Sequence, residues 1–339
     1  MNMQSAIKTL IEQKDIAKDD MIDVMKLIMT GQATDAQMGA FLVALRLKGE
    51  SVDEIVAAAQ VMRELSSKVQ LKNTKHMVDT CGTGGDGANT FNISTVSAIV
   101  VAAAGGIVAK HGNRSVSSQC GSADLLEIAG VNLDLTPEQV GTCIDEIGIG
   151  FMFAPKHHSA MKHAIGPRKE LAIRTIFNVL GPLTNPANSP NQVLGVFDKS
   201  LVEPLANVLK KLGSQHVLVV HSDDGLDEFS INSETYVAEL KEGEISTYHV
   251  SAEQFGLSKA SLSELKAENA KQSLDIIKSV LNGEKNAARD IVLLNAGAAI
   301  YAADLADSIQ QGIEKAAAVI DNGDALNKLN QLVTTTSSL

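Results

Sequence analysis

The sequence predicts an α/β protein, in which a small N-terminal helical domain is joined to a larger α/β domain with a mostly parallel sheet flanked by helices. Apolar residues recur at helical spacing as far as about residue 70, with no strand pattern among them. From residue 76 onward, short apolar runs alternate with helical patterns. A glycine-rich turn joins the first of these runs to a helix. We predict a helical domain over residues 1–72, joined by a helical segment near 160–186, and an α/β domain over 73–339.

The helical domain carries recognisable start signals. Thr34 precedes the helical pattern of Ala36–Leu47, and Ser51 precedes that of Val52–Leu65. Glu54 stands where it can complete a capping box with Ser51. The Met- and Leu-bearing faces of these helices are candidates for a dimer contact, and the alternative is that they pack on one another.

The second part of the chain contains buried strands and then an antiparallel hairpin. Runs that suit buried parallel strands are Met77–Cys81, Ile107–Ala109, Gly148–Phe153, Gln192–Phe197 and His216–His221. Thr235–Leu240 and Glu244–Val250 alternate around a short turn, which predicts a hairpin at the sheet edge. Helices are expected over Ala270–Leu281, Glu284–Ala303 and Leu305–Asn322, followed by a frayed polar tail over Thr334–Leu339.

Composition restricts the class of partner. The 339 residues, 45% of them hydrophobic, are enough for a substantial core, and 29 basic against 40 acidic residues give a net charge of −11. An overall acidic surface does not favour nucleic acid or acidic lipid, so an anionic substrate needs a local cationic cluster. Three cysteines without CxxC spacing indicate a reducing compartment. With neither a signal peptide nor a membrane span in the pattern, we expect a soluble cytoplasmic protein that binds neither nucleic acid nor membrane.

The segment Asp79–Thr95 is the most informative stretch of the sequence. Four of its residues are glycines, and it connects an apolar run to an apolar helix pattern. Such a turn brings backbone N–H groups close to an anion, and the helix N-terminus favours negative charge. The glycines match neither GxGxxG nor GxxxxGK[ST]. The segment therefore predicts a phosphate or pyrophosphate site without a standard nucleotide fingerprint, and an ordinary glycine-rich connection is the alternative.

Three further regions carry candidate chemistry. Lys110–Ser122 combines two cations, an imidazole and several hydroxyls, which suit phosphate oxygens. The acidic run Asp223–Glu228 suits Mg²⁺, and a solvated acidic turn is the alternative for Asp223 and Asp224. Asp227 and Glu228 are expected to point inward because apolar residues flank them. Pro167 suits the first position of a helix, which would put Arg168 in the first turn, where a cation opposes the dipole unless it serves a ligand.

Six blocks together resemble the anthranilate phosphoribosyltransferase family of tryptophan biosynthesis. They are Gly82–Asp86, Asn92–Thr95, Lys110–Ser118, Gly121–Asp124, Arg174–Pro186 and Asp227-Glu228. The resemblance covers nearly the whole chain and implies a Mg²⁺-dependent glycosyltransferase that acts between two domains and forms a homodimer. Gln119 and Cys120 depart from the Lys-Ser that is commoner at these positions, so one positive charge near the diphosphate is missing.

The resemblance also implies roles for individual residues. Those expected to hold phosphoribosyl pyrophosphate are Gly82, Gly85, Asp86, Thr90, Asn92, Ile93, Ser94, Thr95, Lys110, His111, Gly112, Asn113, Arg114, Ser115, Val116, Ser117, Ser118 and Ser122. Those expected to meet anthranilate are Gly82, Asn113 and Arg168, with His111 and His158 as weaker candidates. Those expected to bind Mg²⁺, directly or through the substrate, are Ser94, Asp227 and Glu228.

Two alternatives stay open on the sequence. Pyrimidine nucleoside phosphorylases are similar in architecture and in the second polar loop, but they need no Mg²⁺ pair, so Asp227-Glu228 favours the transferase. A non-enzymatic nucleic-acid-binding relative would carry a basic surface, and the charge of −11 argues against it.

Overall fold

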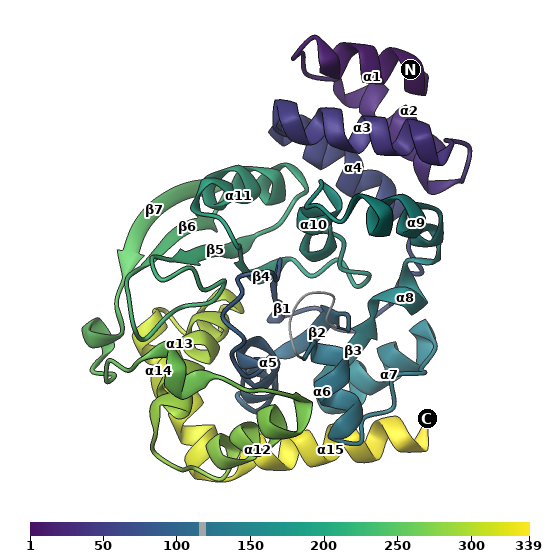
Figure 1. Ribbon diagram of the computed structural model, residues 1–339. Coiled ribbons are helices and arrows are strands. Elements are labelled where there is room, and N and C mark those ends of the chain that lie inside the picture. Colours follow the sequence, from purple (N-terminus) through teal and green to yellow (C-terminus); the bar gives the residue numbers. More distant parts are fainter. Residues whose placement is uncertain (115–119) are drawn as a thin grey trace.

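The computed structural model describes residues 1–114 and 120–339 and divides them between a helical part and a layered α/β part. Helices α1 to α4 stand apart from the sheet in Figure 1, and the segment carrying α9 and α10 lies between them and the sheet. Within the described residues, no helix is long and apolar enough to cross a membrane.

The helical part begins with α1 (Met3–Ile11), α2 (Lys18–Met29), α3 (Asp35–Lys48) and α4 (Val52–Glu64). Thr34 and Ser51 cap α3 and α4 through complete capping boxes, the second with Glu54 as predicted. Met25, Ile28 and Met38 are buried among these helices. The methionine-bearing faces therefore pack on one another, as the second alternative predicted, whereas Leu47 of α3 remains exposed.

The sheet has the strand order β3-β2-β1-β4-β5-β6-β7. Its strands are β1 (Met77–Gly82), β2 (Ile107–Gly112), β3 (Ile149–Phe153), β4 (Asn191–Gly195), β5 (His216–Ser222), β6 (Thr235–Lys241) and β7 (Glu244–Val250). The first five strands are parallel, and β6 and β7 form the predicted antiparallel hairpin at one edge. β2 extends through Gly112, so Lys110 and His111 lie on a strand and not in the loop that the sequence suggested.

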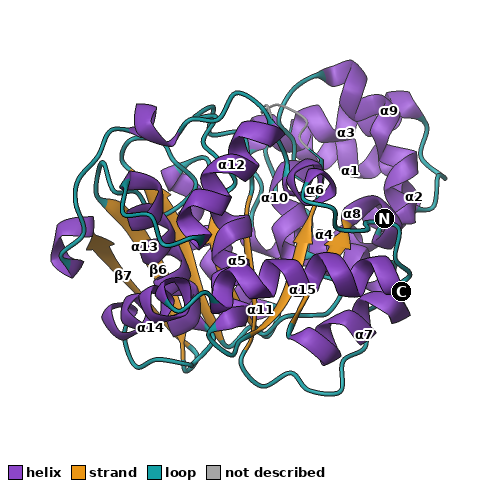
Figure 2. Ribbon diagram, turned by 90° about the horizontal axis from the view of Figure 1, so that it is seen from below, coloured by secondary structure: helices purple, strands orange, loops and turns teal. Residues whose placement is uncertain are grey.

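Helices cover both faces of the sheet, which Figure 2 shows from below. The remaining α-helices are α5 (Ile93–Ala103), α6 (Ser122–Ile128), α7 (Pro137–Ile147), α8 (Ala154–His157), α9 (Lys162–Leu171), α10 (Phe177–Leu180), α11 (Val202–Lys211), α12 (Ala270–Leu281), α13 (Ala287–Ala302), α14 (Ile309–Asp321) and α15 (Asp324–Ser338). Val78 and Val108 pack in the core with α5 and α13, whereas Met77 and Ala109 face the cluster that includes α7 residues. This alternation is the period of two that a strand covered on both faces requires.

Two local predictions are wrong. The tail predicted to fray forms the end of α15, where Thr336 is buried and its hydroxyl receives a hydrogen bond from the backbone N–H of Asn132. Tertiary packing therefore overrides the low helix propensity of the Thr- and Ser-rich sequence. Pro167 lies inside α9 and not at its start, because α9 already begins at Lys162.

The predicted fold class is confirmed, with helical and α/β parts and a mostly parallel sheet. α9 packs against α3 and α2. The boundary at residue 72 and the role of residues 160–186 as a connection remain our proposal, and this packing supports it.

Candidate active site

The candidate site lies at the carboxyl ends of the parallel strands. β1 has β2 on one side and β4 on the other, so the strand order reverses between β1 and β4. Open α/β sheets bind ligands at such a switch point. The glycine-rich loop leaves β1 there, and the loops after β2 and β5 leave the same edge of the sheet.

The acidic loop after β5 lies directly against the glycine-rich loop. The Gly84 N–H donates to Oδ2 of Asp227 at 2.8 Å. A Cβ added at Gly82 would lie 2.5 Å from that Oδ2 atom, and one added at Gly195 would lie 1.5 Å from the Asp227 carbonyl oxygen. Glycine is therefore required at the ends of β1 and β4, because the Asp227 side chain fills the space beside Gly82 and the Asp227 backbone fills the space beside Gly195.

Three acidic side chains, Asp86, Asp227 and Glu228, lie near one another at this point. Burial, and then the charge of Asp86, raises the pKa of Asp227 to about 7. Burial and the Asp227 charge raise the pKa of Glu228 well above its usual range. Oxygen ligands with excess negative charge are what Mg²⁺ prefers, so the residues present fit this ion. No group of three His, Cys, Asp or Glu side chains in the described part of the chain is arranged to enclose a metal by itself.

Lys110 supplies positive charge to the same place. Its ammonium is buried and donates to the Thr80 carbonyl and, at 3.2 Å, to Oγ of Ser94. Burial lowers the pKa of Lys110, while Asp79, Cys81 and Glu228 act in the opposite direction. Lys110 and Ser94, predicted from separate blocks of sequence, are therefore in direct contact.

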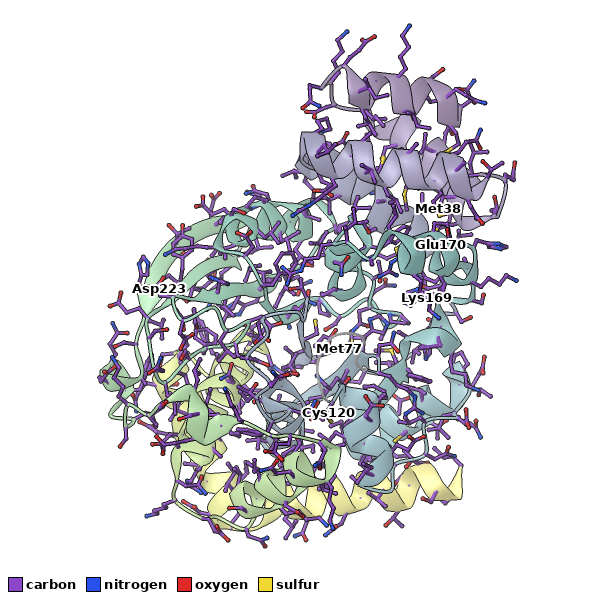
Figure 3. The ribbon with its side chains drawn as sticks, in the orientation of Figure 1. Met38, Met77, Cys120, Lys169, Glu170 and Asp223 are labelled. Atoms are coloured by element: carbon purple, nitrogen blue, oxygen red, sulfur yellow. The ribbon has the colours of Figure 1, made fainter. Side chains whose placement is uncertain are left out.

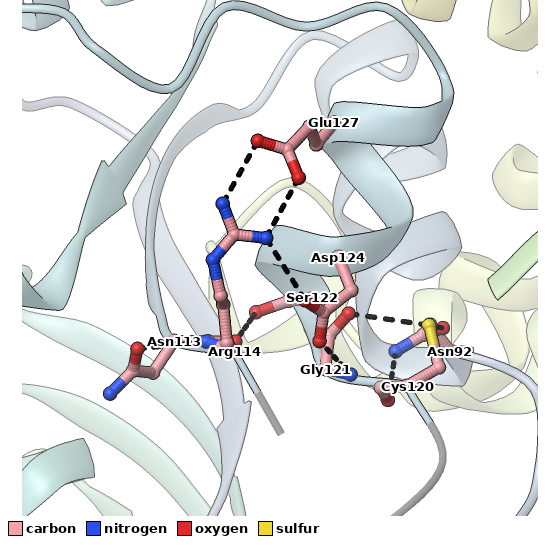
Figure 4. Close-up of polar contacts among 8 residues, drawn as sticks. All are labelled: Asn92, Asn113, Arg114, Cys120, Gly121, Ser122, Asp124 and Glu127. Carbon is pink, nitrogen blue, oxygen red and sulfur yellow. Dashed lines mark hydrogen bonds and ion pairs between the residues drawn. The ribbon is translucent and has the colours of Figure 1, made fainter. Parts of the chain in front are cut away.

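Asn92, at the N-cap of α5, is the centre of a hydrogen-bond network that sequence reasoning missed. Its Oδ1 accepts from Ser273 Oγ at 2.8 Å and from the Cys120 thiol at 3.1 Å. Its backbone N–H donates to Ser273 Oγ. Its Nδ2 donates to the Cys120 carbonyl, as Figure 4 shows. Burial raises the pKa of Cys120 to about 11, so the thiol stays protonated and acts as a donor. Ser273 lies far along the chain on α12, and no local motif signals its role.

Arg114 turns toward α6, as Figure 4 shows. Its guanidinium pairs with Glu127 at 2.8 Å and with Asp124 at 3.1 Å. Ser122, at the start of α6, donates to the Asn113 carbonyl. The structure therefore brings Asn113 and Ser122 together and engages Arg114 with acidic side chains.

Asp79 is a buried acid to which the sequence reading gave no role. Its carboxylate accepts from Asn185 Nδ2 at 2.8 Å and from the His111 N–H at 3.3 Å. Burial raises the pKa of Asp79, and the Lys110 charge opposes that rise. The sequence did offer a signal for this role, because Asp79 is an acid inside the apolar run Met77–Cys81. The network fixes β1, β2 and the turn at Asn185 to one another beneath the site.

His111 and His158 form a buried pair whose Nε2 atoms are 3.2 Å apart. Burial, and then neighbouring cationic groups, lowers the pKa of His111 well below its usual range and that of His158 to about 4. Both rings are therefore neutral at pH 7 and offer a polar but uncharged wall.

Arg168 lies in the last turn of α9, which corrects the prediction that it occupies a first turn. A cation there is favourable with the helix dipole, so the dipole no longer hints at a ligand. Arg168 is half-buried and its Cζ lies 5.2 Å from the Phe177 ring centroid. Among the described residues no carboxylate pairs with it, and burial lowers its pKa. Its charge is therefore available to an anion.

The other predicted residues are placed as follows. Ile93 and Thr95 are buried, so a ligand could meet little more than their backbone. Thr90 forms an isolated bridge with Lys266 beside the same loop, and Gly112 is packed against Ser122. Ser115, Val116, Ser117, Ser118 and Gln119 lie outside the described residues.

Asp223 does not join the acid cluster. It is exposed and pairs with Lys199 at 3.0 Å. In Figure 3 it lies at the side of the molecule opposite to Lys169, which marks the position of α9. Asp224 accepts from Ser230 and Asn232 within its own loop. Asp224 therefore stabilises the turn that presents Asp227 and Glu228.

Comparisons with known proteins agree with this arrangement. The model of the glycosyl transferase family, a/b domain, matches residues 74–326, and that of the helical bundle domain matches residues 4–66. The chain is 60% identical over 338 residues to an anthranilate phosphoribosyltransferase of Thioalkalivibrio sulfidiphilus, with 100% of both chains covered. The chain belongs to the anthranilate phosphoribosyltransferase family.

Solved structures of the family share the whole fold. The enzyme of Thermus thermophilus superposes with a TM-score of 0.93 at 40% identity, covering 98% of this chain and 99% of that one. The Saccharomyces cerevisiae enzyme in complex with PRPP and Mg superposes with a TM-score of 0.91 at 30% identity, covering 99% and 98%. The predicted family is confirmed, and so is the prediction of a glycosyltransferase of tryptophan biosynthesis.

Proposed function

We propose that the protein transfers the phosphoribosyl group of 5-phosphoribosyl 1-pyrophosphate to the amine of anthranilate, giving N-(5-phosphoribosyl)anthranilate and pyrophosphate. The observation that carries this assignment is the meeting of the glycine-rich loop with Asp227 at the switch point of the sheet. The family relationship over the full chain supports the same reaction.

The diphosphate is the leaving group, and it gains negative charge as its bond to the anomeric carbon breaks. We assign its binding to the glycine-rich loop, to the N-terminus of α5 and to Lys110, because backbone N–H groups and a fixed ammonium stabilise developing charge. Lys110 is already oriented by Thr80 and Ser94, so its position requires little rearrangement during reaction.

Mg²⁺ would be held by Asp227 and Glu228 beside Asp86, with Ser94 as a neighbouring hydroxyl. When bound, the ion supplies charge neutralisation between the carboxylates and the diphosphate. The Gly84 N–H holds one oxygen of Asp227, which fixes the carboxylate toward the loop.

The second substrate brings an aromatic amine and a carboxylate. We assign the carboxylate to Arg168, whose guanidinium pairs with no carboxylate in the described part of the chain. Arg168 lies over Phe177 of α10. His111 bonds the backbone of Gly181, which directly follows α10. This short segment therefore connects Arg168 with His111. An aromatic amine is neutral at pH 7 and already carries a lone pair, so alignment of the two substrates accounts for most of the remaining rate enhancement.

We further propose a homodimer. The exposed apolar side chains Ile11 and Leu47 on the helical domain, 67% and 76% exposed, support a contact there. Light scattering coupled to gel filtration should give twice the mass of the 35.8 kDa chain, and a monomer at micromolar concentration would refute the proposal.

The test of the activity is pyrophosphate release by the purified protein with Mg²⁺ and phosphoribosyl pyrophosphate, measured with and without anthranilate. We expect release only when anthranilate is present, together with loss of anthranilate fluorescence. Phosphorolysis of thymidine without anthranilate turnover would instead support the nucleoside phosphorylase alternative.

A further inference from the structure

Arg174 is an exposed arginine that reaches from the segment after α9 to the glycine-rich loop. Its Nη2 donates to the Gly85 carbonyl, and its Cζ lies 3.9 Å from the Phe197 ring centroid. Phe197 follows β4, and its backbone N–H donates to Thr83 Oγ1 at 3.1 Å. The guanidinium thus contacts both the glycine-rich loop, at Gly85, and Phe197, whose backbone is itself bonded to that loop at Thr83.

The fit around this guanidinium is close. A Cβ added at Gly85 would lie 3.0 Å from the Arg174 Nη2 atom, and Gly85 has a φ of +81°. A side chain at this position would crowd the arginine. It would also make the left-handed backbone conformation energetically unfavourable. The contact with Arg174 and the conformation of the loop therefore depend on the same glycine.

The bond to the Gly85 carbonyl also fixes the direction of an N–H group. In a trans peptide the C=O and the following N–H point in opposite directions, so the Asp86 N–H points away from Arg174. Neither the Gly85 N–H nor the Asp86 N–H donates to an acceptor within residues 1–114 and 120–339. Within the described residues, two backbone donors without an acceptor thus lie in the loop assigned to the diphosphate, directly after Gly84, whose N–H donates to Asp227.

The charge of Arg174 is also free of ion pairs. No carboxylate in the described ranges lies within ion-pair distance of it, and its one recorded acceptor is a neutral carbonyl. A planar guanidinium stacked on an aromatic ring is held in one orientation at low entropic cost, which a lysine cannot reproduce.

We propose that Arg174, stacked on Phe197, is a positioning residue that orients the Asp86 N–H group toward the diphosphate. Because Arg174 closely follows α9, which carries Arg168, the same segment would serve both substrates. This inference rests on the proposed function.

The test compares Arg174→Gln and Arg174→Lys with a matched control. The control is Lys169→Gln, which removes an exposed cation from α9 (Figure 3). Loss of a charged hydrogen bond predicts a rise of about ten- to hundredfold in KM for phosphoribosyl pyrophosphate in Arg174→Gln. We expect an intermediate rise in Arg174→Lys, a change within about twofold in KM for anthranilate, and a Tm near that of wild type, because the side chain is exposed.

A second measurement does not depend on catalysis. Hydrogen exchange of residues 83–88 in the ligand-free protein should be faster in Arg174→Gln and in Phe197→Leu than in wild type or Lys169→Gln. Unchanged exchange with an unchanged KM for phosphoribosyl pyrophosphate would overturn the proposal, and so would equal rises in both KM values. If wild type releases no pyrophosphate, the proposed function fails, and the exchange comparison still decides whether Arg174 orders the loop.

Discussion

Gly195→Ala should disable the site without touching any residue assigned to substrate. The added methyl would lie 1.5 Å from the Asp227 carbonyl oxygen, whereas ordinary contact begins at 3.4 Å. The Asp227 backbone must therefore move by about 2 Å, because β4 is held on both sides by β1 and β5 and cannot yield.

The size of this movement sets the expected effect. A misplacement of about 1 Å at a catalytic centre can cost about a hundredfold in rate. We expect kcat/KM to fall by at least that factor, the Mg²⁺ concentration for half-maximal rate to rise, and overpacking to lower stability by about 1–3 kcal/mol.

The assay measures pyrophosphate release as a function of Mg²⁺ concentration, with thermal melting in parallel. It is applied to a series of Gly→Ala variants that differ in the severity of the expected clash. Gly82→Ala would come within 2.5 Å of the Asp227 side chain but only to an ordinary 3.6 Å from its backbone oxygen, so it should have a smaller effect. Gly39→Ala, on α3, meets nothing within 4 Å and serves as the control. A folded Gly195→Ala protein with wild-type rate and Mg²⁺ dependence would refute the reasoning.

Three other predictions concern single groups. Arg168→Ala should raise KM for anthranilate far more than KM for phosphoribosyl pyrophosphate, and equal effects in steady-state kinetics would dismiss its role. Asp227→Asn with Glu228→Gln should abolish both the Mg²⁺ dependence and most of the rate, so a normal Mg²⁺ titration would exclude them as ligands. Burial raises the pKa of Glu239, but hydrogen bonds from His216, Tyr301 and Tyr248 outweigh this and lower it overall. Its carboxylate therefore stabilises the fold above the unfolded pKa of about 4.3, and the contribution is lost as pH falls through the folded value. Glu239→Gln should destabilise by about 1.5–3 kcal/mol at pH 7, and the Tm difference from wild type should shrink toward pH 3; a constant difference would contradict this.

Much of the fold was predictable because the central strands are continuous apolar runs that end at polar loops. The strand predicted over His216–His221 differs from β5 by one residue at its end. β2 was predicted too short, because Lys110 and His111 are polar although they are buried on the strand. Their burial depends on Asp79 and His158, which a local pattern cannot reveal.

The site was predictable to the extent that its residues lie in short, ordered blocks. Asp227 and Lys110 belong to such blocks, and the electrostatic contact of Lys110 with Glu228 joins them. Ser273 was missed because it is a single polar residue whose hydrogen-bond partner, Asn92, lies far away in sequence. The error at Pro167 arose because a proline is more common at a helix start than inside a short helix.

The position of α15 has a consequence for the order in which the protein becomes functional. α15 packs against α5, the helix whose N-terminus we assign to the diphosphate, and Leu332 lies in the same core as Val96 and Ile99. A chain still on the ribosome, with this last helix not yet synthesised, would expose part of the apolar side of α5 to water. Ligand binding at the front of α5 should therefore appear only late in translation, and a nascent chain stalled before Asp324 is expected to be a substrate for chaperones.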